Sequence, residues 1–571
     1  MQSSSIKSAI GHTLRRIGIY REVMKAQRIL SDRSYRQNWL EVERDLATTR
    51  RSIGGFLNLG EHRADPKKEL LVISSSDLPV LVKFHAMFAK ALQLRGYTPI
   101  IVTKSYNKVA QEYFKLFGFG ERNLLFWDHY VRDFGPRESE VRNIVDELLE
   151  NRPPVSEIKD LKFRGVQVGK HALSRATRVL LRGQFDLNDS ELRGIFSNHL
   201  ADAIRSVLVA ERFFDGHHVE KMLVRDAGYA PNGGIYEVGL LRGVDAIRME
   251  MGQRRGCWLF KRYSLSTAGK ALFSISEPTW EQLKDTPLTE SQRKELDENF
   301  AERYDPASLM DVNLYQAGKR VVPEDSVRAR LGLDPRKKTA LVFSHISWDA
   351  SFFDGEDVYD DYEQWLVETT RAASANPNLN WVIKLHPANV FKLKREDGVT
   401  EETEMIALRK LGPLPEHVKI LHADTEINTR ALFPIMDYCL TVRGTIGMET
   451  PCFGVPALTA GTGRYDGYGF TNDSRTREEY EEKLASLHTV APVPPNQSEL
   501  ALRHAYWTLV RRQTSFEDVS EVSMRPVCEA RSALHQNVRI RARSLEEFET
   551  AESIGRFSDW STNSEAPDLI V

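Results

Sequence analysis

Short apolar runs alternate with amphipathic helical patterns in two separate stretches of the chain. In the first stretch, the runs "ELLVISSS" (69–76) and "YTPIIVT" (97–103) flank the helical pattern "VLVKFHAMFAKALQLRG" (80–96). In the second, "KKTALVFSH" (337–345) and "NWVIKLHP" (380–387) flank a helical pattern of the same kind. Alternation of this type is typical of βαβ units, which build a parallel sheet. The pattern therefore predicts an α/β protein with two doubly wound halves.

Changes in this pattern divide the chain into four parts. We expect a basic helical arm over residues 1–66 and a Rossmann-like N-terminal domain over 67–330, with charged, helix-like sequence inserted at 131–216. A second Rossmann-like domain is expected over 335–490. The proline cluster "VAPVPPN" then interrupts the chain, and the helical periodicity beyond it predicts a helical tail over 491–571.

Composition and charge narrow the classes of protein that fit. The 571 residues carry a formal net charge of −2, which argues against a general nucleic-acid binder. None of the four cysteines belongs to a CxxC pair, so the sequence indicates neither a zinc site nor a disulfide framework. The sequence contains no run of about 18 apolar residues and begins without the apolar stretch of a signal peptide. We expect a cytoplasmic protein.

The arm combines an apolar helical stripe with many basic side chains. The stripe consists of Ile6, Ile10, Leu14, Ile17, Tyr20 and Met24, and Lys or Arg residues occupy much of the remainder. A helix of this kind can lie on an anionic surface, which would make the protein peripheral to the inner membrane. It can equally pack its stripe against the protein itself. The sequence leaves both placements open.

Polar residues follow two of the predicted strands in the second half. His386 ends the strand "WVIKLHP" and Arg443 ends "DYCLTVRG", so both are expected at the sheet edge where parallel α/β proteins bind ligands. Gly444 and Thr445 then begin a predicted helix, whose free N–H groups and dipole favour a phosphate. Glu449 follows one turn later, where its carboxylate can accept both hydroxyls of a ribose. Together these residues predict a nucleotide site.

Acidic residues raise two further questions of chemistry. The stretch "FFDGEDVYDDYE" (352–363) lacks a clean DxD motif, so we predict a solvated face there in preference to a metal site. A general base for an inverting transfer should come from the N-terminal half. Asp226 ends a strand and is our choice, while Glu237 fits a helix position and Asp77 fits a helix cap.

Three motifs resemble those of a known family. "KLHP", "RGTIGMETPCFGVP" and "GTGRYDGYGFT" resemble the capsule and surface polysaccharide glycosyltransferases of the GT-B fold, which include bacterial Kdo transferases. The His-Pro pair also resembles that of bacterial sialyltransferases, where it meets the phosphate of a CMP-sugar. The likeness is strong over residues 339–487 and diffuse over the N-terminal half. It implies two Rossmann-like domains that face a cleft, with the donor on the C-terminal one.

The resemblance also implies roles for particular residues. The residues expected to bind the nucleotide-sugar are Lys384, His386, Pro387, Arg443, Gly444, Thr445, Glu449, Arg464 and Tyr465. The loop "YAPNGGIYEVGLLRG" is similar to an acceptor loop, with Tyr229, Asn232 and Glu237 as acceptor residues. The expected catalytic residues are Asp226 and His386. We expect neither a metal nor a cofactor, because enzymes of this fold use a helix dipole and cationic side chains instead.

The predicted function is transfer of a sugar from a nucleotide-sugar to a growing bacterial surface polysaccharide or lipid-linked acceptor. CMP-, GDP- and UDP-sugars all stay open as donors. Three alternatives share parts of the pattern: a polyol-phosphate transferase of the teichoic-acid type, a UDP-GlcNAc 2-epimerase and a non-catalytic glycan-binding module of the same fold.

Overall fold

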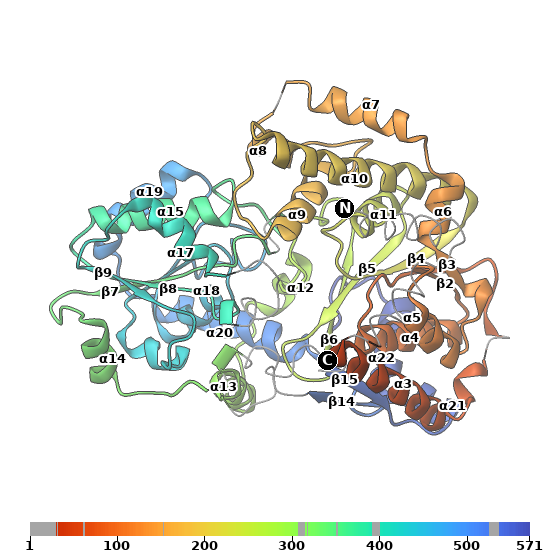
Figure 1. Cartoon of the computed structure of the whole chain (residues 1–571). Coiled ribbons are helices and arrows are strands. Elements are labelled where there is room, and N and C mark those ends of the chain that lie inside the picture. Colours follow the sequence, from red (N-terminus) through yellow and green to blue (C-terminus); the bar gives the residue numbers. More distant parts are fainter. Residues whose placement is uncertain are drawn as a thin grey trace.

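Two α/β lobes make up the protein (Figure 1). The computed structural model describes residues 30–570 except 31, 61–62, 152, 307–314, 317, 350–351, 391–399 and 525–535. Each lobe is built around one predominantly or wholly parallel sheet.

The N-terminal lobe contains a seven-stranded sheet in the order β13-β6-β5-β4-β1-β2-β3. Its strands are β1 (Glu69–Ile73), β2 (Thr98–Thr103), β3 (Leu124–Phe126), β4 (Val219–Val224), β5 (Asp245–Met251), β6 (Cys257–Tyr263) and β13 (Thr514–Ser515). Strands β1 to β5 are parallel, whereas β6 runs antiparallel to β5 and β13 antiparallel to β6. The chain runs outward from β1 on one side and from β4 on the other, so the sheet is doubly wound, with its switch point between β1 and β4.

Helices cover both faces of this sheet. One face carries α3 (Arg33–Ile53), α4 (Pro79–Leu94) and α5 (Lys108–Leu116), and the other carries α9 (Val168–Leu180), α10 (Ser190–Gly216) and α11 (Asn232–Leu241). The remaining helices of the region between β3 and β4 are α6 (Trp127–Phe134), α7 (Glu138–Leu148) and α8 (Val155–Lys159). The apolar run "NLLFWDHY" has the composition of a strand, but it turns helical at Trp127, because Trp127, Tyr130 and Phe134 recur at helical spacing and their rings contact one another in sequence.

The C-terminal lobe contains a six-stranded parallel sheet in the order β12-β11-β10-β7-β8-β9. Its strands are β7 (Thr339–Phe343), β8 (Asn380–Lys384), β9 (Val418–Leu421), β10 (Tyr438–Thr441), β11 (Ala457–Thr459) and β12 (Asn472–Asp473). Its helices are α14 (Glu324–Leu331), α15 (Tyr362–Ala375), α17 (Thr403–Leu408), α18 (Ile446–Glu449) and α19 (Arg477–Ala485). This sheet is also doubly wound, and its switch point lies between β7 and β10.

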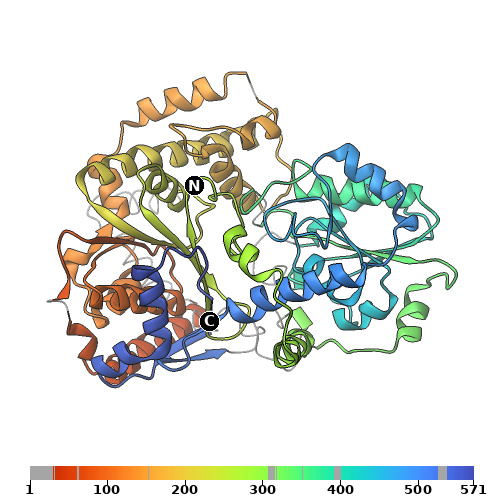
Figure 2. The same cartoon turned by 180° about the vertical axis from the view of Figure 1, so that it is seen from behind.

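The chain crosses between the lobes twice. Helices α12 (Glu277–Leu283) and α13 (Glu290–Tyr304) lead from the first lobe to the second, and α20 (Pro495–Tyr506), which continues as a π-helix over Trp507–Arg511, leads back (Figure 2). The returning segment adds β13 to the first sheet, then forms the hairpin β14 (Ser520–Met524) and β15 (Gln536–Ile540) and the helices α21 (Leu545–Thr550) and α22 (Glu552–Asn563).

The tail was predicted to be helical, and the structure adds strands to its helices. The reason is local: Val522 and Val538 lie opposite each other in the β14–β15 hairpin, and both are buried. Farther along, the ring centre of Phe516 lies 5.1 Å from that of Phe88, and that of Phe557 lies 4.7 Å from that of Phe260. The tail therefore completes the core of the N-terminal lobe.

The predicted arm is described only in its second part. Helix α3 packs on the lobe through Val42, Leu46 and Ile53, and Asp45 forms an ion pair of 2.6 Å with the buried Lys83. The apolar stripe of the arm lies outside the described residues. Within the described part of the chain, no helix is both long and apolar enough to cross a membrane.

Candidate functional site

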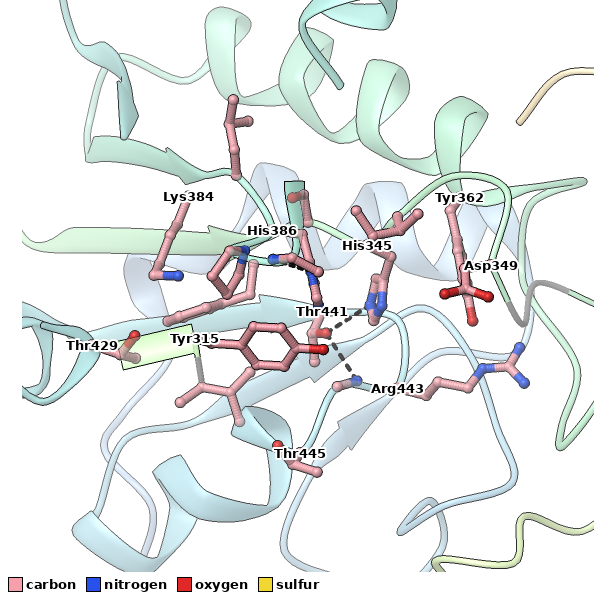
Figure 3. A pocket seen from close by; sticks show the side chains of 18 of the residues that line it. Tyr315, His345, Asp349, Tyr362, Lys384, His386, Thr429, Thr441, Arg443 and Thr445 are labelled. Atoms are coloured by element: carbon pink, nitrogen blue, oxygen red, sulfur yellow. Dashed lines mark hydrogen bonds between the residues drawn. The ribbon is translucent and has the colours of Figure 1, made fainter. Parts of the chain in front are cut away.

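A pocket of about 440 Å³ lies at the switch point of the C-terminal sheet. Three neighbouring strands, β10, β7 and β8, end at this pocket. The residues that follow these strands, Arg443, His345 and His386, all line the pocket; Figure 3 shows that the Arg443 side chain extends away from the two histidines. His386 and Arg443 were both expected here because each follows a strand, and the carboxyl ends of the strands in a doubly wound sheet meet at the ligand-binding edge.

His345 is a pocket residue that the sequence analysis missed. It follows β7, and its Nε2 accepts the N–H of Val442 at 3.3 Å and lies 3.0 Å from Oγ1 of Thr441. Because Nε2 accepts a backbone N–H, the ring carries its proton on Nδ1. Burial, together with the charges of His386 and Arg443, lowers the pKa of His345 well below the usual value. His345 is thus neutral and joins the ends of β7 and β10.

His386 presents the opposite tautomer to the pocket. Its Nδ1 accepts the N–H of Ala388 at 3.2 Å, so in the neutral ring the proton lies on Nε2. The buried carboxylate of Glu404 fixes the strand end: it accepts the N–H of His386 at 3.0 Å, the amide of Asn389, and the hydroxyl of Ser344 at 2.9 Å. Glu404 therefore positions the ends of β7 and β8 together.

Lys384 is the last residue of β8 and lines the pocket with only 4% of its surface exposed. Its Nζ lies 5.8 Å from the centre of the Phe343 ring. The pKa of Lys384 is lowered to about 7, mainly by burial. The charge of Lys319 also lowers this pKa, and its effect is larger than the opposite effect of Glu404. An anion in the pocket would reverse part of that effect, so Lys384 is suited to pair with a phosphate.

Arg443 lines the pocket as expected from its position after β10, but it is buried. Its guanidinium pairs with Asp357 and donates to the carbonyl of Phe353 at 3.2 Å. Burial acts against the charge, but Asp357 and other neighbouring groups together raise the pKa of Arg443. Arg443 therefore stays cationic, with Asp357 as its constant partner.

The prediction of a solvated face over residues 352–363 is wrong. Asp361 is buried, the side chain of Asp357 is only 5% exposed, and Asp354 pairs with Arg248 of the other lobe at 2.6 Å. Glu356 likewise pairs with Lys170 of α9. These carboxylates face cations contributed by distant parts of the chain, which a local sequence pattern does not reveal. The described residues contain no cluster of three or more His, Cys, Asp or Glu suited to a metal ion.

The turn after β10 is closely packed around Gly444. The N–H of Gly444 donates to Oγ1 of Thr441 at 3.1 Å, and a Cβ at Gly444 would lie 2.8 Å from that oxygen. Thr445 follows at the start of α18, which has four residues before it continues as a 3₁₀ turn over Thr450–Phe453. So short a helix offers little dipole, and the phosphate cradle expected here is reduced to the first N–H groups of the turn.

Glu449 lines the pocket, but both of its oxygens already have donors. One accepts from Arg303 at 2.7 Å and the other from the hydroxyl of Tyr304, both from α13. Arg303 also donates to Oγ1 of Thr445 at 3.3 Å. The Glu449 side chain is 2% exposed. A ribose would have to share Glu449 with these partners.

The remaining predicted donor residues divide into two groups. Pro387 and Arg464 line the pocket, and the guanidinium of Arg464 lies 5.4 Å from the ring of Phe273. Tyr465 is buried beneath the turn, where its hydroxyl donates to the carbonyl of Gly444 at 2.7 Å. Tyr465 thus supports the turn from below.

A second pocket, of about 690 Å³, lies at the switch point of the N-terminal sheet. Asp226 lines it from the end of β4, in a left-handed backbone conformation with φ of 56°, and pairs with Arg225 at 2.6 Å. Tyr229 and Asn232 also line it; the amide of Asn232 donates to the carbonyl of Arg225 at 3.2 Å.

Two other acidic candidates lie elsewhere. Glu237 pairs with His171 at 2.9 Å and accepts the N–H of Gln167, in a separate cavity beside this pocket. Asp77 accepts the side-chain amide of Asn107 at 2.8 Å. Neither residue lines the two pockets.

The two pockets meet at one residue. Asp349, in the loop after β7, lines both of them. The ligand-binding edges of two doubly wound lobes therefore face each other, which is the GT-B arrangement, and the predicted fold class is confirmed. Such an arrangement can hold two ligands with their reacting atoms close together.

No protein-family model and no curated protein match the chain. Among solved structures it is similar to the β-Kdo 2,4-transferase KpsC of Thermosulfurimonas dismutans, with 16% identity over 50% of this chain and 79% of that one, at a TM-score of 0.30. It is also similar to UDP-GlcNAc 2-epimerase of Neisseria meningitidis bound to UDP-GlcNAc (10% identity, 77% and 95% covered, TM-score 0.24). A third similar structure is HepE of Anabaena in complex with UDP-glucose (10%, 77% and 93%, 0.26). These scores are low, and the fold assignment stands on the strand orders of the two sheets.

Proposed function

We propose that the protein is a glycosyltransferase that uses a nucleotide-sugar donor. The observation that carries this proposal is the pair of pockets, one at the switch point of each sheet, with Asp349 between them. The C-terminal pocket holds the donor and the N-terminal pocket holds the acceptor. A transferase needs two adjoining sites of this kind, because the acceptor hydroxyl must reach the sugar carbon while the nucleotide leaves.

The donor pocket has the groups that a departing phosphate requires. Negative charge grows on the leaving oxygen as the bond to the sugar carbon breaks, so a donor or cation beside it lowers the barrier. Nε2–H of His386 and the ammonium of Lys384 fill this role in our proposal, with Arg464 as a further cation. Neither a metal nor a cofactor is required by this scheme.

The general base has to reach both ligands. Asp226 lines the acceptor pocket alone and is held by Arg225, whereas Asp349 borders both pockets. We therefore assign the base to Asp349, with Asp226 as the second candidate. Asp349→Asn should lower kcat by about 10²–10⁴-fold, the usual contribution of general base catalysis. An equal loss in Asp226→Asn with none in Asp349→Asn would reverse the assignment.

The finer proposal concerns substrates and place in the cell. The His-Pro pair of β8 favours a CMP-sugar, and the acceptor is a growing bacterial surface polysaccharide or a lipid-linked glycan. The basic arm would hold the cytoplasmic protein against the inner membrane, where a lipid-linked acceptor lies. The proposed function does not involve binding to nucleic acid.

Nucleotide binding tests the proposal directly. Thermal unfolding of the full chain is followed with CMP, UDP and GDP, because a ligand that binds the folded state stabilises it by RT ln(1 + [L]/Kd). One nucleotide should stabilise the wild type and lose its effect in His386→Ala. The matched control is His422→Ala, an exposed histidine of the same lobe. Absence of stabilisation by all three nucleotides would contradict the proposal.

The enzyme alternatives separate in a second assay. A transferase releases nucleotide in proportion to an added acceptor, whereas an epimerase converts the sugar while it stays attached to the nucleotide. Nucleotide binding without either reaction would favour a non-catalytic module.

A further inference from the structure

Basic side chains outnumber acidic ones in the walls of the N-terminal pocket. Its charged and titratable lining residues are Lys104, Arg175, Arg178, Arg205 and His199 on the basic side, and Asp202, Asp226 and Asp349 on the acidic side. The basic residues come from three elements, the end of β2, helix α9 and helix α10, so no single helix face explains their meeting.

Two of the carboxylates already have cationic partners. Asp202 pairs with Arg205 at 2.7 Å within α10, and Asp226 pairs with Arg225, which lies outside the lining. Among the residues that the structure describes, neither Lys104 nor Arg175 forms an ion pair with a carboxylate. Their charges are available to a ligand that enters the pocket.

Neighbouring groups respond to this positive charge. His199 of α10 has its pKa lowered, first by burial and then by the charge of Arg175, which outweighs the opposite effect of Asp202. The charge of Arg175 adds to the effect of burial, so positive charge from the pocket reaches His199. Binding of an anion would reduce this positive charge.

The same pocket offers aromatic surface. Trp127, Tyr106 and Tyr229 line it beside the cations, and the ring of Tyr106 lies 5.7 Å from Nζ of Lys104. Aromatic rings give flat apolar contact area, which suits the C–H faces of a sugar ring. The pocket volume of about 690 Å³ falls within the range of small-molecule sites, which is roughly 300–1,000 Å³.

We propose that this pocket selects an anionic saccharide as the acceptor, with Lys104 and Arg175 binding its carboxylate or phosphate and the aromatic residues contacting its ring. This inference rests on the proposed transferase function and names the acceptor class for it. Charge-assisted hydrogen bonds from Lys and Arg are the usual means of recognising such groups. A sugar acid and a sugar phosphate share this chemistry, and the experiment separates them.

The test measures binding of three probes to the full chain by ligand-detected NMR: galacturonate, galactose 1-phosphate and uncharged galactose. At least one anionic probe should bind more tightly than galactose. The anionic probe with the higher affinity shows whether the pocket prefers a carboxylate or a phosphate. Arg175→Gln and Lys104→Met should each lower the affinity for that probe by about tenfold or more, because each variant loses a charge-assisted hydrogen bond. The matched controls are Arg142→Gln and Lys115→Met, two surface residues outside the pocket, which should bind like the wild type.

The outcomes separate this inference from the proposed function. Equal binding of galactose and both anionic probes, no binding of either anionic probe, or unchanged binding in both pocket variants would overturn the anionic acceptor. Nucleotide binding, measured in the same variants, should not change, because neither residue lines the C-terminal pocket. Anionic probes that bind a protein without nucleotide affinity would support the pocket while contradicting the transferase.

Discussion

Binding of a nucleotide phosphate in the C-terminal pocket should draw a proton onto Lys384. The pKa of Lys384 in the empty pocket is about 7, so at pH 8 about one tenth of the molecules carry this charge. A phosphate beside Nζ returns the pKa toward its ordinary value of about 10.4, and the lysine becomes almost fully protonated. The binding reaction at pH 8 should therefore take up about 0.9 proton from the buffer.

The same linkage fixes how affinity depends on pH. Because the pKa is higher in the bound state, the favourable contribution of Lys384 is fully present below pH 7 and is lost as pH rises through the bound-state pKa. Affinity should accordingly fall by up to about tenfold per pH unit between roughly pH 8 and 10. At these pH values the phosphate itself stays ionised, since its second pKa is about 6.

Calorimetry in buffers of different ionisation enthalpy measures the proton uptake. Lys384→Met should remove it. The matched variant is Lys319→Met, a second buried lysine whose loss raises the pKa of Lys384 and so reduces the uptake without abolishing it. Binding heats that are independent of the buffer at pH 8 in the wild type would refute the pairing of Lys384 with the phosphate.

Three further predictions follow from the site and the arm. Arg443→Met leaves Asp357 buried without its cation and should lower the free energy of unfolding by about 3–5 kcal/mol in urea titrations, with partial recovery in a double variant that also carries Asp357→Asn. Glu449→Gln should also lower the free energy of unfolding, because it leaves the buried Arg303 without its carboxylate partner. If Glu449 also accepts ribose hydroxyls, calorimetry on this variant will show a nucleotide affinity lower by about tenfold to a hundredfold. Deletion of residues 1–29 should release the protein from anionic liposomes in a salt-titrated sedimentation assay, since each Lys or Arg near such a surface contributes about 1 kcal/mol, whereas a lower melting temperature with unchanged liposome binding would favour an arm packed on the protein.

Strand ends were the part of the site that sequence could predict. In a parallel sheet, the residue after each strand lies at the ligand edge, so His386 and Arg443 met in one pocket although 57 positions separate them. The same rule applied to "VFSH" would have found His345, which ends β7 in the same way. Asp349 follows four residues later in a loop, and no periodic signal marks it.

Partners from distant parts of the chain were the part that sequence could not predict. Arg303 and Tyr304 take the oxygens of Glu449, and Tyr465 turns its hydroxyl to the backbone of Gly444. These contacts depend on how α13 and the loop after β11 pack, which local patterns do not encode. The strands of the tail were missed for a related reason: β13 has two residues, and it exists because the exposed edge of β6 accepts it.

The pairing of β13 with β6 has a consequence for how the protein is made. Thr514 leaves the ribosome about 250 residues after Tyr263, a delay of roughly 13–50 s at ordinary rates of translation. Throughout that interval the edge of β6 is unpaired, and the aromatic surface around Phe88 and Phe260 is not yet covered by Phe516 and Phe557. An unpaired edge is a template for pairing with other chains. The N-terminal lobe therefore matures only after synthesis ends, and a fragment that stops before the tail should aggregate where the full chain folds.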